Sequence, residues 1–319
     1  MDGLNLSLKK LRYFEAVARL GHFGRAADQC AVTQPALSMQ IAALERELGV
    51  VLLERRTTGV QLTETGRGIA ERARRILNDV RDLGDFARHH QNPLAGTLRL
   101  GVIPSIAPYL LPRLLPKLRS QCGQLDLRVR ETVTHLLVDQ LFEGELDLLL
   151  LALPLDRSDI ETFTVVEDRF VLAVPDQEAA DPLGPTPLDR FRDHRLLLLE
   201  EGHCLRDQAV AFCRRHQIHP SDRFGASSLS TLMQMVANGL GMTLLPEISL
   251  AVEGHHQAVR FIRFDDPQPS RTLALAWRAS SPRKEDFRVL GDLMTAIASE
   301  AGATTKLVGG RRLVRPAPA

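Results

Sequence analysis

The chain opens with three short segments in which apolar residues recur every three or four positions, which is the spacing of one helical face. In the first segment, Leu11, Phe14 and Val17 follow this interval, and Gly21 then marks a helix end. The second segment is short and contains paired alanines that allow close packing. The pattern predicts helices over residues 8–20, 24–30 and 35–48.

The third predicted helix combines an N-terminal signal with two contrasting faces. Either Thr33 or Gln34 is expected as its N-cap, and Pro35 suits the first helical turn. Its apolar face is made of Leu37, Ile41, Leu44 and Leu48, and its other face of Gln34, Ser38, Met39 and Gln40. Residues 52–62 then indicate two short strands around a glycine turn. A helix-turn-helix followed by a basic hairpin is typical of winged helix-turn-helix proteins that bind DNA.

A long amphipathic segment follows the hairpin. It begins at Thr63–Gly66, and its helical pattern runs to about residue 90. Apolar positions recur at alternating steps of four and three, at Ile69, Ala73, Ile76, Val80, Leu83 and Ala87. Such a stripe either packs on the chain's own domain or pairs with a second copy as a coiled coil. We favour a dimerising coiled coil, because the stripe is narrow and its flanks are heavily charged. Residues 91–96 end the helix and are typical of a hinge.

Beyond this hinge, predicted strands and helices alternate. Strands are expected over residues 97–103, 125–131, 147–153, 164–174, 195–200, 242–245 and 273–277. Helices are expected over residues 108–121, 134–142, 204–216, 229–238 and 283–298. Because the stretch Leu148–Leu151 is continuously apolar, we expect parallel sheets that are covered on both faces. Residues 309–319 carry no core-forming pattern and are predicted to be a mobile tail.

Composition narrows the class of protein. With 319 residues, 44% hydrophobic and 25% charged, the chain is long enough for two or more globular domains. It has no apolar run of about 18 residues and no signal peptide, so we expect a cytoplasmic protein that does not contact a membrane. The net charge of +1 is too weak to argue for nucleic acid. Four cysteines without zinc-finger spacing predict neither a disulfide framework nor a metal site, and we expect no cofactor.

Two of the cysteines lie nine residues apart at the start of a predicted helix. At about 1.5 Å and 100° per residue, Cys204 and Cys213 are roughly 13 Å apart along the helix and half a turn out of phase. A disulfide requires Cα atoms about 4.4–6.8 Å apart, so the pair can be bridged only if the helix unfolds. Cys204 also lies between His203 and Arg206, where cations can stabilise a thiolate. From these residues alone, a redox switch and a pair of buried structural cysteines both remain open.

Several motifs resemble LysR-type transcriptional regulators. Residues 23–49, Leu52–Arg55 and Leu62–Gly66 are similar to the DNA-binding module of the family, and Val236–Pro246 is similar to its regulatory domain. Within the family, Gly202–Cys213 and Ile103–Pro112 resemble the hydrogen peroxide sensors. The resemblance implies an all-α winged helix-turn-helix domain, a linker helix, and a periplasmic-binding-protein-like α/β regulatory domain with two subdomains and a cleft between them. The boundaries we expect are 1–66, 67–92, 93–305 and a flexible tail over 306–319.

The same resemblance implies roles for individual residues. Cys204 corresponds to the thiol that peroxide oxidises, and Cys213 to the thiol that then forms the disulfide with it. The polar pocket around Cys204 is expected to include Ser105, Thr134, His203, Arg206, Asp207 and Arg271. Two departures affect these expectations: Ser105 stands where threonine is expected, and Arg223–Gly225 replaces an expected His-Phe-Arg.

For DNA, exposed polar residues of the third helix can read base edges in the major groove, where Gln suits adenine. The expected contacts are Thr33, Gln34, Pro35, Ser38 and Gln40. From the hairpin, Arg55 and Arg56 are expected to contact phosphate or the minor groove. The implied partners are double-stranded promoter DNA of antioxidant genes, hydrogen peroxide as the signal, further copies in a homodimer or homotetramer, RNA polymerase, and a thiol reductant such as glutaredoxin or thioredoxin.

Two other functions fit part of the sequence. A LysR-type regulator could sense a small organic ligand in the same cleft, with the cysteines incidental, but the spacing and polar flanks of Cys204 and Cys213 favour peroxide. A thiol peroxidase could use the same cysteines to turn over peroxide. The winged helix-turn-helix pattern weighs against an enzyme, as does the lack of a second catalytic system for rapid recycling.

Overall fold

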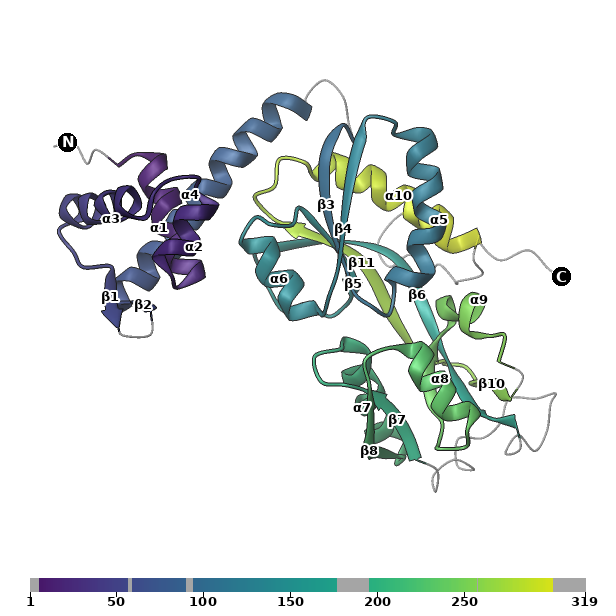
Figure 1. Ribbon diagram of the computed structural model, residues 1–319. Coiled ribbons are helices and arrows are strands. Elements are labelled where there is room, and N and C mark those ends of the chain that lie inside the picture. The colour runs from purple at the N-terminus through teal and green to yellow at the C-terminus, as the bar shows by residue number, and fades with distance from the viewer. Residues whose placement is uncertain (1–5, 57–58, 90–93, 177–194, 257, 301–319) are drawn as a thin grey trace. The chain divides into compact units, whose positions relative to one another are not determined.

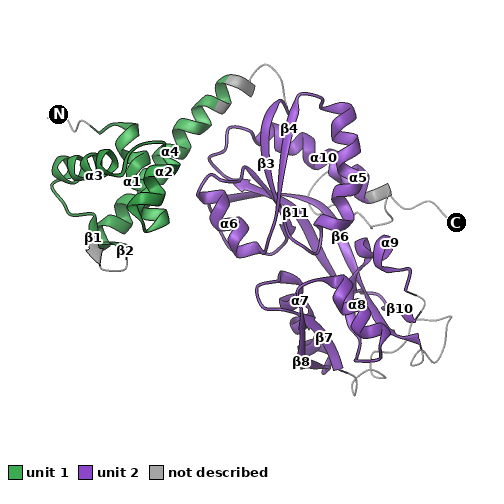
Figure 2. Cartoon of the chain, in the orientation of Figure 1, with its two compact units in different colours: residues 1–88 green, residues 89–319 purple. Residues whose placement is uncertain are grey.

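A computed structural model describes residues 6–56, 59–89, 94–176, 195–256 and 258–300, in two compact units divided after Arg88 (Figures 1 and 2). The first unit contains α1 (Leu8–Leu20), α2 (Phe23–Gln29), α3 (Gln34–Leu48), β1 (Leu53–Arg56), β2 (Gly59–Leu62) and α4 (Glu64–His89). Its core forms where the apolar faces of the first three helices meet, around the fully buried Phe14, Leu37 and Leu44. The winged helix-turn-helix prediction is confirmed.

Local signals set the helix boundaries in this unit. The Thr33 hydroxyl accepts a hydrogen bond from the Ala36 amide, so Thr33 and not Gln34 is the N-cap of α3. Gly21 ends α1 with φ of 61°, a left-handed conformation that favours glycine. At the start of α4, a side chain on Gly66 would meet the Leu52 carbonyl oxygen at 2.1 Å, so only glycine lets the helix pack against the hairpin.

The apolar stripe of α4 is packed against its own domain in the first half of the helix and exposed in the second half. Its first half packs on its own domain, where Ala73 is buried and Ile69 contacts the core. Farther along, the side chains of Ile76, Val80 and Leu83 are 44%, 43% and 68% exposed. The first half of the stripe therefore packs on the chain's own domain, and pairing of the exposed second half with another copy remains a prediction.

The second unit contains two lobes joined by long strands (Figure 1). The first lobe is formed by β3 (Gly96–Val102), α5 (Ala107–Gln121), β4 (Leu125–Glu131), α6 (Thr134–Phe142), β5 (Leu148–Ala152) and α10 (Lys284–Glu300). The second lobe contains β7 (Arg195–Leu199), α7 (Cys204–His216), β8 (His219–Ala226), α8 (Leu229–Ala237), β9 (Thr243–Pro246), η3 (Glu247–Ser249), α9 (Leu250–Glu253) and β10 (Val259–Arg263). The predicted α/β regulatory domain with two subdomains is confirmed.

Two strands connect the lobes, β6 (Ile160–Pro175) and β11 (Ser270–Arg278). They are antiparallel to each other and belong to a seven-stranded sheet of order β10-β6-β11-β5-β3-β4, in which β9 also pairs with β6. Only β3 pairs in parallel within it, with β4 and β5. The expectation of parallel sheets is therefore wrong for most of this sheet, because an apolar run indicates burial on both faces but not strand direction.

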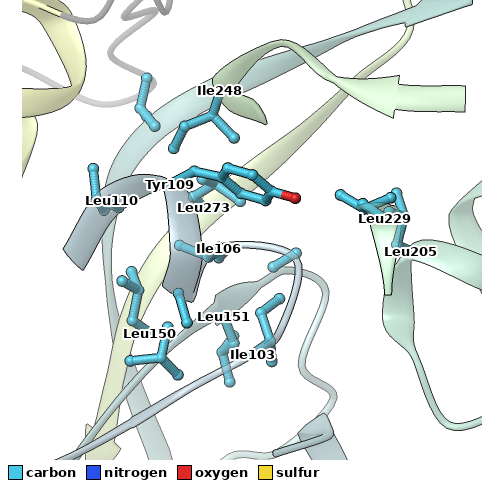
Figure 3. Packing of buried hydrophobic residues seen from close by; sticks show 14 of the residues in the cluster. Ile103, Ile106, Tyr109, Leu110, Leu150, Leu151, Leu205, Leu229, Ile248 and Leu273 are labelled. Atoms are coloured by element: carbon cyan, nitrogen blue, oxygen red, sulfur yellow. The ribbon is translucent and has the colours of Figure 1, made fainter. Parts of the chain in front are cut away.

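Buried side chains from both lobes meet around the connecting strands. Figure 3 shows Ile103, Ile106 and Tyr109 from the first lobe near Leu205 and Leu229 from the second. The Tyr109 hydroxyl donates to Glu253 Oε1 at 3.0 Å, and burial is the main cause of a raised pKa for this tyrosine. The lobes are thus held closed by apolar packing and a buried hydrogen bond.

Some expectations fall outside the described residues or remain predictions. The predicted tail over 306–319 and most of the predicted hinge over 91–96 lie outside the described ranges, and the four domain boundaries remain predictions. Among the described helices, none combines the length and apolarity that crossing a bilayer requires.

Candidate redox pocket and DNA-binding surface

A small pocket lies where three elements of the second unit come together. The end of β3, the start of α6 and the start of α7 contribute its lining, which is Ile103, Pro104, Ser105, Val133, Thr134, His203, Cys204 and Leu205. The space between these side chains, including its opening to solvent, is about 170 Å³, and it is too narrow for a water-sized molecule to enter without side-chain movement. Ligand sites for organic molecules are typically several hundred Å³. Any molecule that reaches the Cys204 thiol must therefore be very small or must displace several of these side chains.

Cys204 is the first residue of α7, and its thiol is half-buried in this pocket. Burial raises the pKa of the Cys204 thiol, while the Arg271 guanidinium and the Thr134 hydroxyl act to lower it. Thr134 Oγ1 is itself buried and has no nitrogen or oxygen hydrogen-bond partner among the described residues. Its hydrogen bond is to the Cys204 thiol, so this hydroxyl and the thiol face the same pocket.

Arg271 lies behind the pocket and reaches Ser105. Its Nη1 atom donates to Ser105 Oγ at 2.8 Å, and its Nη2 atom donates to the Ser105 carbonyl oxygen at 3.0 Å. Its Nε atom donates to Asp168 Oδ2 at 2.9 Å. Ser105, in place of the expected threonine, thus keeps a hydroxyl in the pocket that is held by a fixed cation.

The structure corrects the expected source of positive charge at Cys204. Arg206 donates from Nη1 to the Leu199 carbonyl oxygen at 2.9 Å and does not line the pocket. Burial lowers the pKa of His203, which keeps this imidazole neutral near pH 7. The cation that lowers the pKa of Cys204 is Arg271, which is distant in sequence, whereas the exposed Asp207 raises it. Sequence neighbours on a helix diverge by about 100° per residue, so adjacency to Cys204 did not guarantee contact.

Cys213 lies in the interior of the second lobe. Its side chain is 1% exposed, and burial raises the pKa of its thiol to about 11. Both cysteines are in their thiol form in the described structure, and both lie on the same uninterrupted helix, α7. Because the intact helix holds them about 13 Å apart along its axis, they cannot form a bond in this conformation.

The exposed face of α3 is the candidate DNA-reading surface. Thr33, Gln34 and Pro35 are exposed at its N-terminus, and Ser38 is half-buried. Gln40 follows Ser38 by two positions, about 200° around the helix, so these two side chains lie on opposite flanks. Met39 is 66% exposed between these two flanks, on the face expected from the sequence, although it was not among the expected DNA contacts. In the hairpin, the backbone of Arg55 and Arg56 forms β1, and their side chains lie outside the described part.

Comparison with known proteins places the chain in a family. Residues 8–67 match the bacterial regulatory helix-turn-helix proteins of the lysR family, and residues 91–298 match the LysR substrate binding domain. The chain belongs to the LysR family of DNA-binding transcription regulators. The resemblance inferred from its motifs is confirmed.

The individual relatives include peroxide regulators. A probable hydrogen peroxide-inducible genes activator from Streptomyces viridosporus is 43% identical over 286 residues, which cover 89% of this chain and 92% of that protein. The full-length structure of a cysteine-to-aspartate variant of OxyR from Pseudomonas aeruginosa is 38% identical with a TM-score of 0.74, covering 91% of this chain and 95% of that one. The HTH-type transcriptional regulator EstR from Acinetobacter baylyi is 38% identical over 301 residues, covering 92% and 97% respectively.

Proposed function

We propose that this protein is a transcription regulator that senses hydrogen peroxide through Cys204 and transmits the signal by a disulfide between Cys204 and Cys213. One observation carries the proposal: the Cys204 thiol lines a narrow pocket of about 170 Å³, measured with its opening to solvent, beside the buried Thr134 hydroxyl. Family membership alone does not decide the signal, because EstR is similar over as much of the chain as the peroxide regulators are. The pocket is too small for a typical organic effector, and a molecule little larger than water would enter it with a smaller movement of the lining side chains than an organic effector requires.

The first chemical step is attack of the Cys204 thiolate on one oxygen of hydrogen peroxide. The S–O bond forms as the O–O bond breaks, and the second oxygen leaves as hydroxide that takes a proton to become water. Cys204 is then a sulfenic acid. Thr134 and Ser105 offer hydroxyl groups to the peroxide oxygens, and Arg271 stabilises negative charge on the sulfur and on the leaving oxygen.

The second step joins the two cysteines. Cys213 sulfur attacks the Cys204 sulfenic acid, the S–O bond breaks, and the hydroxyl leaves as water with the Cys213 proton. The high pKa and burial of Cys213 keep it unreactive while α7 is intact. The chain around α7 must therefore unfold before the bond can form, and this rearrangement is the signal that the DNA-binding unit receives.

The proposed output is altered promoter binding in the cytoplasm. Exposed apolar residues on the second half of α4, Ile76, Val80 and Leu83, support a homodimer, and the regulatory domains would complete a homotetramer. We further propose that the regulator recruits RNA polymerase and that glutaredoxin or thioredoxin restores the thiols. A thiol peroxidase would need such reduction at every turnover, whereas a regulator needs it once per signal.

Peptide mapping tests the proposed chemistry. Trypsin cleavage after Arg206 places Cys204 in peptide 196–206 and Cys213 in peptide 207–214, so their disulfide links two separate peptides. After one equivalent of peroxide, we expect this linked pair and a loss of two hydrogen atoms from the intact protein. Oxidation confined to Cys30 or Cys122, or none at all, would contradict the proposal and favour an organic effector.

DNA contacts are expected to divide between the helix and the hairpin. Gln34→Ala should cost ~1–3 kcal/mol on the operator and relax the preference at one base pair. Arg55→Ala should instead weaken operator and random DNA alike and reduce the salt slope by about one, because a phosphate contact carries no sequence information. Fluorescence anisotropy over a salt series on single-base operator variants measures both. Unaltered base preference in Gln34→Ala would mean that another face of α3 reads the DNA.

A further inference from the structure

Two charged side chains behind the pocket are buried completely. Arg271 on β11 and Asp168 on β6 face each other as register partners, and neither side chain has any exposed surface. Removing two charges from water costs several kcal/mol per ion, and an apolar pair of similar volume often gives equal or greater stability. A contribution to stability alone therefore does not account for an ion pair at this place.

Each member of the pair also binds a group outside it, Asp168 in the second lobe and Arg271 at Ser105. Asp168 Oδ2 accepts from Arg271 Nε, and Asp168 Oδ1 accepts from the Ile248 amide at 3.0 Å, at the start of the second lobe's η3. Arg271 also donates from Nη1 to the hydroxyl of Ser105 and from Nη2 to its carbonyl oxygen. The guanidinium is thus fixed between a carboxylate on one side and the wall of the Cys204 pocket on the other.

We propose that Asp168 is a positioning residue for the Cys204 pocket, because its carboxylate holds the Arg271 guanidinium against Ser105 and so fixes the hydroxyl and the positive charge that act on the reacting sulfur. This inference rests on the proposed function of Cys204. Among the described residues, Asp207 on α7 acts against the thiolate, and His203 at the N-cap of α7 lines the same pocket.

Replacing Asp168 by Asn distinguishes two effects of this side chain, its hold on the Arg271 guanidinium and the direct effect of its negative charge on the Cys204 thiol. The amide keeps the volume of the side chain but has one acceptor oxygen for two donors, Arg271 Nε–H and the Ile248 amide, so one of the contacts is lost. By charge alone, loss of a negative group near the pocket should favour the Cys204 thiolate and make it react faster. If Asp168 positions Arg271, the opposite result follows: the pKa of Cys204 rises, and the thiol reacts about tenfold more slowly near neutral pH for each unit of that rise.

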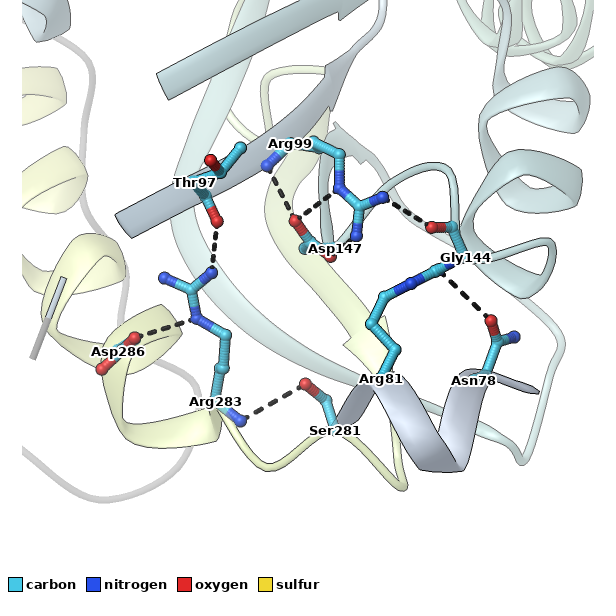
Figure 4. A network of polar contacts seen from close by, with 9 residues as sticks. All are labelled: Asn78, Arg81, Thr97, Arg99, Gly144, Asp147, Ser281, Arg283 and Asp286. Carbon is cyan, nitrogen blue, oxygen red and sulfur yellow. Dashed lines mark hydrogen bonds and ion pairs between the residues drawn. The ribbon is translucent and has the colours of Figure 1, made fainter. Parts of the chain in front are cut away.

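The experiment measures alkylation of Cys204 by iodoacetamide from pH 6 to 10 in the full-length reduced protein, with peptide 196–206 followed by mass spectrometry. The matched control is Asp286→Asn, which breaks another buried ion pair, between Arg283 Nε and Asp286 Oδ2 at 3.0 Å (Figure 4). Arg283 also binds the Thr97 carbonyl oxygen, about 20 Å of extended chain away from Ile103 in the pocket. The control should lower the melting temperature without moving the alkylation profile.

The inference predicts at least tenfold slower alkylation at pH 7.5 in Asp168→Asn and a profile displaced to higher pH. A profile that is unchanged, or displaced to lower pH, overturns it. If Asp168→Asn does not fold, Arg271→Lys takes its place, because lysine keeps the charge but its single ammonium cannot hold Asp168 and Ser105 in the same fork. Wild-type alkylation in Arg271→Lys would also overturn the inference.

The result is independent of the proposed function, because alkylation involves no peroxide. A wild-type protein whose Cys204 ignores peroxide would refute peroxide sensing and leave the alkylation profiles to decide the role of Asp168. A normal peroxide reaction combined with unchanged alkylation in Asp168→Asn would refute the inference alone.

Discussion

Cys204→Ser is expected to abolish the response to peroxide while leaving the reduced protein's fold and DNA binding intact. Serine occupies nearly the same space and keeps a hydrogen-bonding atom in the pocket beside Thr134, but its hydroxyl cannot form a sulfenic acid or a disulfide. The loss of stability should be about 1 kcal/mol. Promoter binding measured by footprinting before and after peroxide should become identical, with operator affinity within twofold of the reduced wild type.

Cys122→Ser is the matched control for this variant. Cys122 is a half-buried thiol at the end of α5, and burial raises its pKa as it does for Cys204, but it does not line the pocket. Its variant should respond to peroxide as the wild type does. A footprint that still changes with peroxide in Cys204→Ser would show that another residue senses the oxidant.

The second large effect expected is loss of helical structure when the disulfide forms. Bridging must bring two Cα atoms from about 13 Å apart to within about 7 Å, which α7 cannot do with its hydrogen bonds intact. Amide protection across α7 should therefore fall at least about a hundredfold in oxidised protein, and exchange should extend through the adjoining β8. Hydrogen exchange with mass spectrometry, on reduced protein and on protein with the mapped disulfide, measures this change.

Helix α10 provides an internal reference in the same experiment. It packs on the first lobe through Phe287 and Leu290, which are fully buried, and shares no residue with the region that must rearrange. Its protection should be equal in the two forms. Equal protection of α7 as well, in protein with a confirmed Cys204–Cys213 bond, would refute the proposed switch.

The elements that could be predicted from the sequence are those with a local signal. Residues 125–131, 134–142 and 204–216 have the predicted structure to the residue, because apolar periodicity and capping act within each segment. By contrast, β8 was missed, since His219–Ala226 is polar and contains proline, and becomes a strand only by pairing with β7. Strand direction also escaped prediction, because it depends on partners distant in the chain.

The candidate site was likewise predictable where a local motif marks a residue, and not where a residue's role depends on a distant partner. Motifs indicated Ser105, Thr134 and Cys204, which the fold brings together in one pocket. Asp168 was missed because it lies in a run of three charged residues, Glu167, Asp168 and Arg169, and only the fold shows that its side chain is buried. Its partner, Arg271, is 103 residues away, and nothing in the local sequence connects the two. The sequence therefore indicates neither that Asp168 is buried nor which residue neutralises its charge.

The sparse attachment of the strand pair β7–β8 has a consequence for how the proposed switch returns to its reduced form. Among the described residues, this parallel pair joins the neighbouring strands through one bridge, between Leu196 and Met242. The seven-stranded sheet can therefore stay folded while α7 unwinds, and recovery requires only that a short helix reform, which takes about a microsecond. Thiol exchange takes seconds to hours. In the proposed switch, the supply of reductant, and not the refolding of the chain, therefore sets the lifetime of the disulfide form.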